Sequence, residues 1–163
     1  MKIMFFADAS SIHTVRWVRY FADKGYSVDV ISFSPAKIKG VNVHIIDCGM
    51  IKAYKTNYKY LLKIFRVRRL FKKIQPDIVI AHYLTSYGFM ASICSNNYHL
   101  VVMGTDVKVT PYKNRLLFFL TKFVLKRAKK IFSVAYHISQ DLQRFNVPER
   151  KITTMQYGIE EEM

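Results

Sequence analysis

Short apolar segments alternate with amphipathic helical segments along this chain, and the alternation constrains the fold more than any other feature. Apolar runs bounded by polar residues are typical of strands buried on both faces of a parallel sheet. We expect strands at residues 2–7, 26–33, 43–47, 78–81, 100–103, 130–134 and 152–156. Helical periodicity predicts helices at residues 12–24, 54–74, 85–95, 114–128 and 138–145. This order predicts an α/β fold, a doubly wound, mainly parallel sheet of about seven strands with helices on both faces.

The length and the cysteine content indicate what kind of domain this is. A chain of 163 residues can build one compact domain with a sizeable core. Cys48 and Cys94 have no metal-type spacing, so we expect reduced thiols and no metal site. The N-terminal apolar run is too short for a signal peptide, and no run approaches the ~20 apolar residues of a membrane span. The sequence therefore predicts a cytoplasmic protein.

A strong excess of basic residues marks the surface. The formal net charge is +15, and residues 48–76 hold nine bases and no acid. Residues 107–140 also contain no acid. Such a charge suits nucleic acid, an anionic membrane surface or a phosphorylated substrate. No RNP, KH, zinc-finger or helix-turn-helix pattern accompanies it, so we expect no nucleic-acid partner.

The basic helix predicted at residues 54–74 is amphipathic and can lie on anionic lipid. The residues expected to face the membrane are Lys59, Lys63, Arg66, Arg69 and Lys73. The alternative is a solvated helix face. On the lipid hypothesis, the protein is peripheral on the inner face of the plasma membrane.

The predicted sheet brings four loop segments to one edge, because the carboxyl ends of parallel strands meet there and open α/β sheets bind ligands there. The segments are residues 8–13, 82–87, 104–106 and 136–137. No glycine precedes residue 25, so the G-x-G-x-x-G and P-loop patterns are absent, which argues against a dinucleotide oxidoreductase or a P-loop NTPase. Ser10 or Ser11 can cap the first helix and leave its N-terminal amides to an anion. The alternative is a plain cap beside a surface histidine, His13.

Polar residues follow two buried strands at this edge. His82 directly follows the apolar run 78–81 and can act as a general base, orient a hydroxyl group or merely end the strand. Gly104 permits close backbone approach after the strand at 100–103, and Asp106 is one of only 11 acids. Asp106 either belongs to a ligand site or caps a helix and balances charge. The residues themselves leave both interpretations open.

Five segments, in order and in register, resemble the motifs of one enzyme family. Segment 10–17 resembles S-x-H-x-x-R-W, and segment 25–30 resembles G-H-x-V-x-V. Segment 76–82 resembles P-D-v-v-h-x-H, and segment 104–107 resembles G-S-D-V. Segment 128–160 is similar to a domain end that reads n-G-v-D. These are motifs of a bacterial branch of the family-4 retaining glycosyltransferases, which have the GT-B fold, and they cover essentially the whole chain.

The resemblance implies a division into domains. Residues 1–157 would form the Rossmann-like, acceptor-binding N-terminal domain, and residues 158–163 would begin the crossover to a C-terminal, donor-binding domain. The E-x7-E segment of that second domain has no counterpart here. Because the family binds the nucleotide-sugar mainly there, we expect this domain alone to bind no cofactor and to be inactive. The donor domain would belong to the same chain or to a separate subunit.

The resemblance also implies roles for residues at the predicted edge. The implied substrate-binding residues are Ser10, Ser11, His13, Arg16, Gly104 and Thr105. The first three would lie near the donor phosphates, and Arg16 would assist them. The implied catalytic residues are His82 and Asp106, which would contact acceptor hydroxyls. The chain departs from the family at Met103, Ala135 and Tyr157, where many members have histidine, serine and asparagine. Met103 leaves the assignment of a catalytic base open.

The resemblance predicts the N-terminal domain of a glycosyltransferase of the hexosyltransferase type, in polysaccharide biosynthesis. It would move a sugar with retention from a nucleotide-sugar donor to a glycan or a lipid-linked acceptor. Two alternatives remain. The chain could be a non-catalytic glycan- or membrane-binding module, or one subunit of a two-chain transferase.

Overall fold

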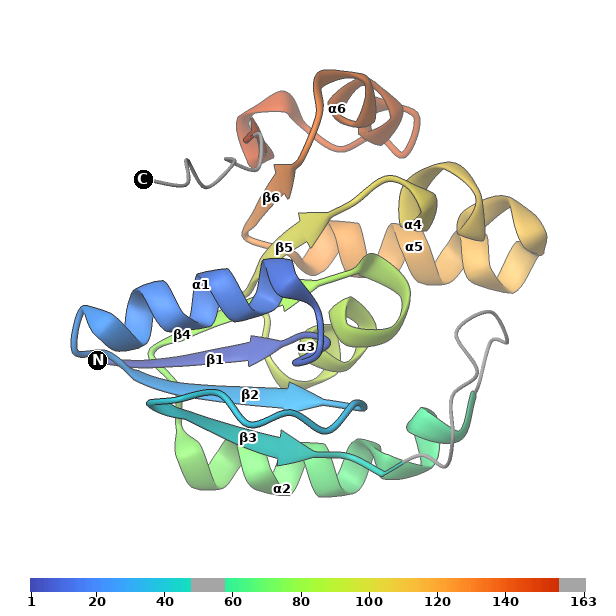
Figure 1. The fold of residues 1–163 in the computed structure, drawn as a ribbon. Helices are drawn as coiled ribbons and strands as arrows, with labels where there is room; N and C mark the ends of the chain where they lie inside the picture. Colours follow the sequence, from blue (N-terminus) through green and yellow to red (C-terminus); the bar gives the residue numbers. More distant parts are fainter. Residues whose placement is uncertain (48–57, 156–163) are drawn as a thin grey trace.

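Seven strands form one sheet in the computed structural model, which describes residues 1–47 and 58–155 (Figure 1). The strands are β1 (Lys2–Phe6), β2 (Ser27–Ser32), β3 (Val41–Ile45), β4 (Ile78–His82), β5 (His99–Val102), β6 (Lys130–Ser133) and β7 (Ile152–Thr154). Their order is β3-β2-β1-β4-β5-β6-β7, and all neighbours pair in parallel. The predicted α/β fold is confirmed. The strand pair within residues 26–47 joins the sheet in the same direction as the rest.

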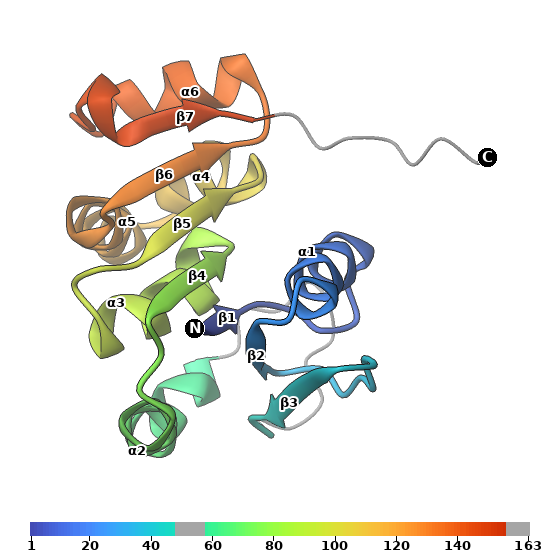
Figure 2. The same cartoon turned by 90° about the vertical axis from the view of Figure 1, so that its left-hand side faces the viewer.

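Helices cover both faces of the sheet, as predicted. The α-helices are α1 (Ile12–Asp23), α2 (Ile64–Ile74), α3 (Phe89–Cys94), α4 (Thr105–Lys108), α5 (Arg115–Arg127) and α6 (Tyr136–Gln143). The shorter turns are η1 (Tyr58–Lys63), η2 (Leu84–Gly88), η3 (Thr110–Lys113) and η4 (Glu149–Lys151). Helix α1 lies on one face, and α2, α3 and α5 lie on the other (Figure 2). The chain moves across the sheet in one direction from β1 to β2 and in the opposite direction from β4 onward. Because the crossovers between parallel strands are right-handed, the helices of the two halves lie on opposite faces of the sheet.

Two predicted helices differ from the observed elements. The helix expected at residues 54–74 is a 3₁₀ turn, η1, followed by α2 from Ile64, and residues 54–57 lie outside the described part. The helix expected at residues 85–95 is a π-helical turn, η2, followed by the short helix α3. The predicted domain boundary at residue 157 also lies outside the described residues.

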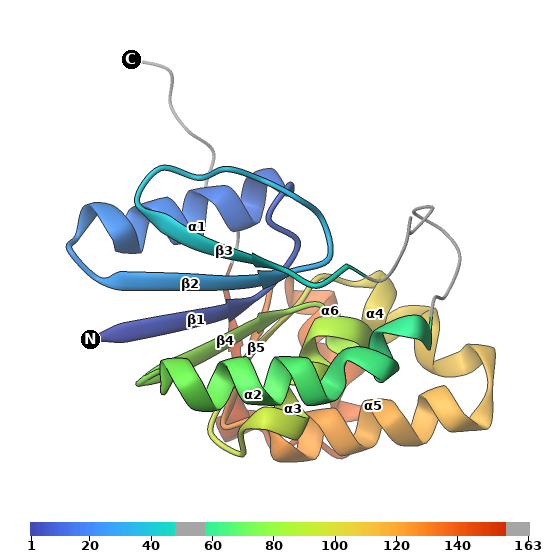
Figure 3. The same ribbon diagram turned by 90° about the horizontal axis from the view of Figure 1, so that it is seen from below.

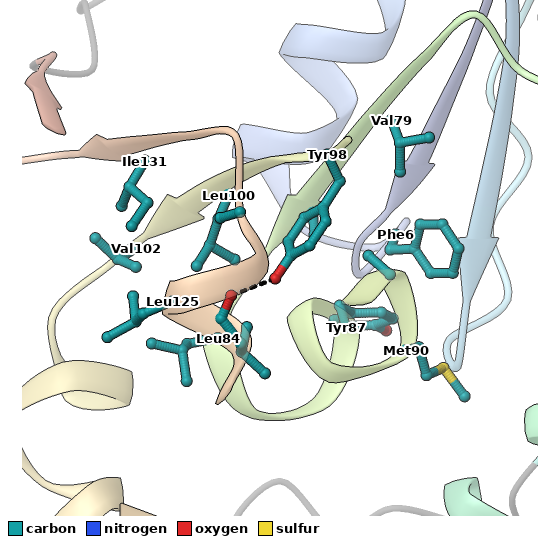
Figure 4. Close-up of a cluster of buried hydrophobic side chains, with 14 of the residues drawn as sticks. Phe6, Val79, Leu84, Tyr87, Met90, Tyr98, Leu100, Val102, Leu125 and Ile131 are labelled. Atoms are coloured by element: carbon teal, nitrogen blue, oxygen red, sulfur yellow. Dashed lines mark hydrogen bonds between the residues drawn. The ribbon is translucent and has the colours of Figure 1, made fainter. Parts of the chain in front are cut away.

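Two buried clusters lie on the two sides of the sheet. Alternate residues of β1 serve both, since Phe6 faces the cluster beneath α2, α3 and α5, whereas Phe5 faces the cluster with Val18 of α1. Tyr98 is fully buried in the first cluster, and its hydroxyl donates a hydrogen bond to the Val124 carbonyl of α5 (Figure 4). Burying each such large apolar side chain contributes about 1.5–3 kcal/mol, which fixes both helix layers on the sheet.

The strand order reverses between β1 and β4. Strand β1 continues in sequence toward β2 and β3 on one side, whereas β4 continues toward β5, β6 and β7 on the other. Phe6 of β1 is paired with Ala81 of β4, so the segments that follow these two strands leave the sheet side by side. This is the topological switch point, where open α/β sheets bind ligands.

Candidate functional site

The turn between β1 and α1 is the first segment at the switch point. Asp8 organises it, because its Oδ1 accepts hydrogen bonds from Ser10 N at 3.0 Å and from Ser10 Oγ at 2.7 Å. Ser11 occupies the N-cap position of α1, but within the described part its side chain makes no cap bond. The structure therefore places one of the two predicted serines, Ser11, at the N-cap, without a side-chain bond to the helix. The positive end of the α1 dipole lies at this turn, and such helix ends favour anions.

His82 ends β4 beside this turn and is buried, with 2% of its surface exposed. Its ring lies edge-on to Phe5 and Trp17, with ring centroids 5.9 and 5.5 Å away. Nδ1 lies 3.4 Å from Thr14 Oγ1, and Nε2 has no hydrogen-bond partner among the described residues. The second segment at the switch point therefore begins with a buried imidazole, that of His82, which lies beneath the first two turns of α1.

The protonation of His82 follows from this environment. Burial, together with the charge of His13, lowers the pKa of His82 from 6.5 to about 4. The imidazole is therefore neutral at pH 7, and so low a pKa makes it a poor general base. Its Nε2 can still donate or accept one hydrogen bond. Of the three roles open to His82 from sequence, the structure favours orienting a hydroxyl group or ending the strand.

Asp106 is also buried, with no exposed surface. Its Oδ1 accepts hydrogen bonds from the backbone N–H groups of Met103 and Gly104 at 3.1 and 2.8 Å, and Oδ2 accepts from Leu84 N at 3.0 Å. Burial raises the pKa of Asp106, and these backbone donors act in the opposite direction. The carboxylate therefore ties the turn after β5 to Leu84, the second residue after β4, and its predicted contact with an acceptor hydroxyl stays a prediction.

The turn from β5 into α4 places Gly104, the N-cap of α4, and Thr105, its first residue, at the edge. Gly104 has φ +123°, a conformation that side chains rarely adopt, and a Cβ there would lie 3.4 Å from Ile138 Cδ1. Thr105 is exposed, and its Oγ1 lies 3.0 Å from the hydroxyl of Tyr83. Sequence reasoning missed Tyr83 as a site residue. Its position directly after the buried strand β4, at the predicted ligand edge, was the available signal.

The structure brings the predicted residues together in two groups. His13 lies close enough to His82 for its charge to lower the pKa of His82, and both lie under or on the start of α1. Gly104, Thr105 and Asp106 form the other group, which is bonded to residues following β4. Arg16 is half-buried one turn further along α1, where it makes contacts of its own. The predicted binding and catalytic roles of all these residues stay predictions.

The residues predicted to face a membrane lie on η1 and α2. Arg66, Arg69 and Lys73 are exposed, and Lys63 is half-buried. The side chain of Lys59 lies outside the described residues. No helix in the described part is long and apolar enough to cross a membrane. Across residues 1–47 and 58–155, no three His, Cys, Asp or Glu side chains gather in a group that could hold a metal ion.

The sequence matches a known family over most of its length. The model of the family described as glycosyl transferase 4-like matches residues 2–135. This chain belongs to the glycosyl transferase 4-like family. The resemblance read from the five motifs is thereby confirmed. No curated protein sequence matches this glycosyl transferase 4-like chain significantly.

Solved structures show the same fold. The lipopolysaccharide outer core galactosyltransferase WaaB matches 98% of this chain with a TM-score of 0.63 at 13% identity, over 46% of its own length. MurG from Acinetobacter baumannii matches 99% of the chain (TM-score 0.57, 14% identity, 46% of MurG). UDP-GlcNAc 2-epimerase from Neisseria meningitidis matches 94% (TM-score 0.63, 14% identity, 45% of the epimerase). The chain thus has the fold of the N-terminal half of GT-B enzymes and spans about half their length.

Proposed function

We propose that this glycosyl transferase 4-like chain is the acceptor-binding half of an enzyme that transfers a sugar, with retention, from a nucleotide-sugar to a glycan or a lipid-linked acceptor. The family match supports transfer chemistry, and the fold match to half of each GT-B chain supports a division of labour with a second domain. The observation that carries the proposal is the switch point, where the α1 N-terminus, His82 and the Gly104–Thr105 loop meet one edge of the sheet.

The start of α1 is the proposed contact to the donor phosphates. Ser11 at its N-cap makes no side-chain cap bond, and the helix dipole places partial positive charge there. His13 and Arg16, one turn apart on α1, add side chains that can donate hydrogen bonds to phosphate oxygens. Stabilising the charge of a departing nucleoside diphosphate is an electrostatic task, so this arrangement needs no nucleophile of its own.

The loop after β5 is the proposed contact to the acceptor. Thr105 is exposed at the start of α4, directly after the buried Gly104. In this proposal Asp106 positions the loop through its three backbone hydrogen bonds, and the neutral His82 orients one hydroxyl through Nε2. The second domain, supplied by the same chain or by a separate subunit, would hold the nucleotide-sugar, so this chain by itself would be inactive.

The native form of the protein tests this division. We expect mass spectrometry of the protein purified from its own cells to show a species of about twice 19.2 kDa, or a stable complex with a second chain of similar size. A free native species of 19.2 kDa with no such partner would contradict the proposal. It would favour the alternative of a non-catalytic glycan- or membrane-binding module.

The face that carries α2 and α5 is the proposed contact to an anionic membrane (Figure 3). Leu62 and Phe65 expose 79% and 83% of their surfaces, and Leu116 and Phe119 of α5 expose 63% and 65%. Exposed bases, among them Arg69, occur on the same two helices. Apolar side chains enter the lipid interface, and each Lys or Arg near an anionic surface contributes about 1 kcal/mol. A lipid-linked acceptor would lie in the same membrane.

Sedimentation with phosphatidylglycerol vesicles tests this contact. We expect wild-type protein to bind these vesicles and not phosphatidylcholine vesicles, with binding that weakens as salt rises. Arg69→Glu on α2 should weaken the binding. Arg19→Glu makes the same charge change on α1, on the opposite face, and should weaken it much less. Equal losses in the two variants would mean that net charge alone attracts the protein, and the proposed membrane face would be wrong.

A further inference from the structure

Tyr83, directly after β4 at the switch point, has a strained backbone. Its φ of 74° and ψ of 124° lie outside the regions that side chains ordinarily allow. Gln75 also has positive φ, but it is the left-handed C-cap of α2, a conformation common at helix ends. A tyrosine in the conformation of Tyr83 persists only where its surroundings enforce it.

The surroundings of Tyr83 hold its backbone from both sides. Its N–H donates to the carbonyl of Val101 at 3.0 Å, and its own carbonyl accepts from Gly88 N at 2.8 Å. Gly88 is needed for that contact, because a Cβ there would lie 2.9 Å from the Tyr83 carbonyl oxygen and 2.9 Å from Leu100 Cδ1. The intervening turn, η2, is π-helical, a form that occurs frequently at functional sites.

The strained backbone keeps an aromatic ring at the surface of the ligand edge. The side chain of Tyr83 is exposed to 39%, so burial of the ring is not what the strain provides. Its hydroxyl lies 3.0 Å from Thr105 Oγ1, which holds the far end of the side chain on the loop after β5. The result is a ring anchored at both ends, between the two loops of the proposed acceptor site, with part of its surface open.

We propose that Tyr83 is the stacking platform for a hexose ring of the acceptor. A sugar has an apolar face of C–H groups, which an exposed aromatic face can cover, while the hydroxyls of the sugar bond to polar groups around it. Tyr83 supplies the aromatic face, and Thr105 supplies a hydroxyl beside it. A preorganised ring loses little conformational entropy on binding. This inference rests on the proposed function, because it assigns a substrate class to the same edge of the sheet.

Saturation-transfer NMR with methyl glycosides tests the platform. The probes are methyl β-glucopyranoside, methyl β-galactopyranoside and methyl N-acetyl-β-glucosaminide, each titrated into the wild-type chain. We expect at least one probe to bind, with the strongest transfer from aromatic protons to H3 and H5 on the apolar face of the sugar. Tyr83→Ala should weaken binding about ten-fold, equivalent to about 1.4 kcal/mol. Tyr83→Phe keeps the ring and should weaken it less than three-fold.

Two further variants distinguish a platform from a merely strained turn. Tyr83→Gly removes the ring and relieves the positive φ, so it should fold well and still lose about ten-fold in binding. Tyr20→Ala removes an exposed tyrosine from α1 and should bind like the wild type. Wild-type binding that survives in Tyr83→Gly would overturn the platform and leave the proposed function standing. Failure of the wild type to bind any of the three probes would overturn the platform together with the acceptor role of this edge.

Discussion

Acidification should destabilise the fold through His82. Burial and the charge of His13 lower its pKa to about 4, whereas the unfolded chain has the ordinary value of 6.5. Between these values the unfolded state binds more protons, so the free energy of unfolding falls as the pH falls. The contribution of His82 to the free energy of unfolding is fully present above pH 6.5 and is lost by about pH 4. Each unit of difference between the folded and unfolded pKa values is worth about 1.4 kcal/mol, so the total loss of stability is about 3 kcal/mol.

Urea unfolding at pH 7, 6, 5 and 4 measures this loss. The matched variant is His82→Gln, whose amide is polar but does not titrate in this range. The variant will have a constant offset in stability, so the informative quantity is the difference between the two proteins as a function of pH. His99 also has a lowered pKa, through burial and the charges of Lys129 and Lys130, but it is present in both proteins and cancels. If the two stability curves run parallel from pH 7 to 4, His82 does not have the environment described above.

Three further substitutions test the loops at the ligand edge by thermal and urea unfolding. Asp106→Ala leaves three backbone N–H groups without their acceptor, at about 1–3 kcal/mol each, so we expect it to lose at least 3 kcal/mol; a loss below 1 kcal/mol would contradict the bonding described. Gly88→Ala should lower the free energy of unfolding by about 1–3 kcal/mol through its clash with the Tyr83 carbonyl. Gly25→Ala should lower it less, because a Cβ at Gly25 meets no other atom and only the positive φ is unfavourable. Tyr83→Gly should remain within about 1 kcal/mol of the wild type, since relief of backbone strain of about 1–3 kcal/mol offsets the lost hydrogen bond to Thr105. It should also be more stable than Tyr83→Ala, which keeps the strain. If Tyr83→Ala is the more stable variant, the turn is not strained.

Most of the sheet could be predicted from the sequence, because buried parallel strands need continuous apolar runs and such runs are visible directly. The run at residues 78–81 is β4 without its last residue, His82, and the run at 2–7 is β1 with one further residue. The helix at 85–95 could not be predicted correctly. Its π-helical first turn depends on contacts from elsewhere, namely the bond from Leu84 to Asp106 and the fit of Gly88 against Leu100.

The location of the candidate site could also be predicted, and the state of its side chains could not. Alternating strands and helices determine which loops share an edge, so the segments around His13, His82 and Thr105 were identified from order alone. The burial of His82 under Trp17 and the use of both Asp106 oxygens by backbone donors are properties of packing. The position of Tyr83 directly after β4 was visible in the sequence, but its strained backbone was not, because backbone strain leaves no mark in a single sequence.

A transfer assay on the native protein tests the central claim most directly. The protein, purified with whatever second domain or subunit its cells supply, is incubated with radiolabelled UDP-glucose, UDP-galactose, UDP-N-acetylglucosamine and GDP-mannose, each with membranes from the same cells. We expect one donor to label a glycan or lipid, the new linkage to keep the donor's anomeric configuration, and Thr105→Ala to reduce the labelling. Free sugar epimers without transfer, or no reaction with any donor, would contradict it.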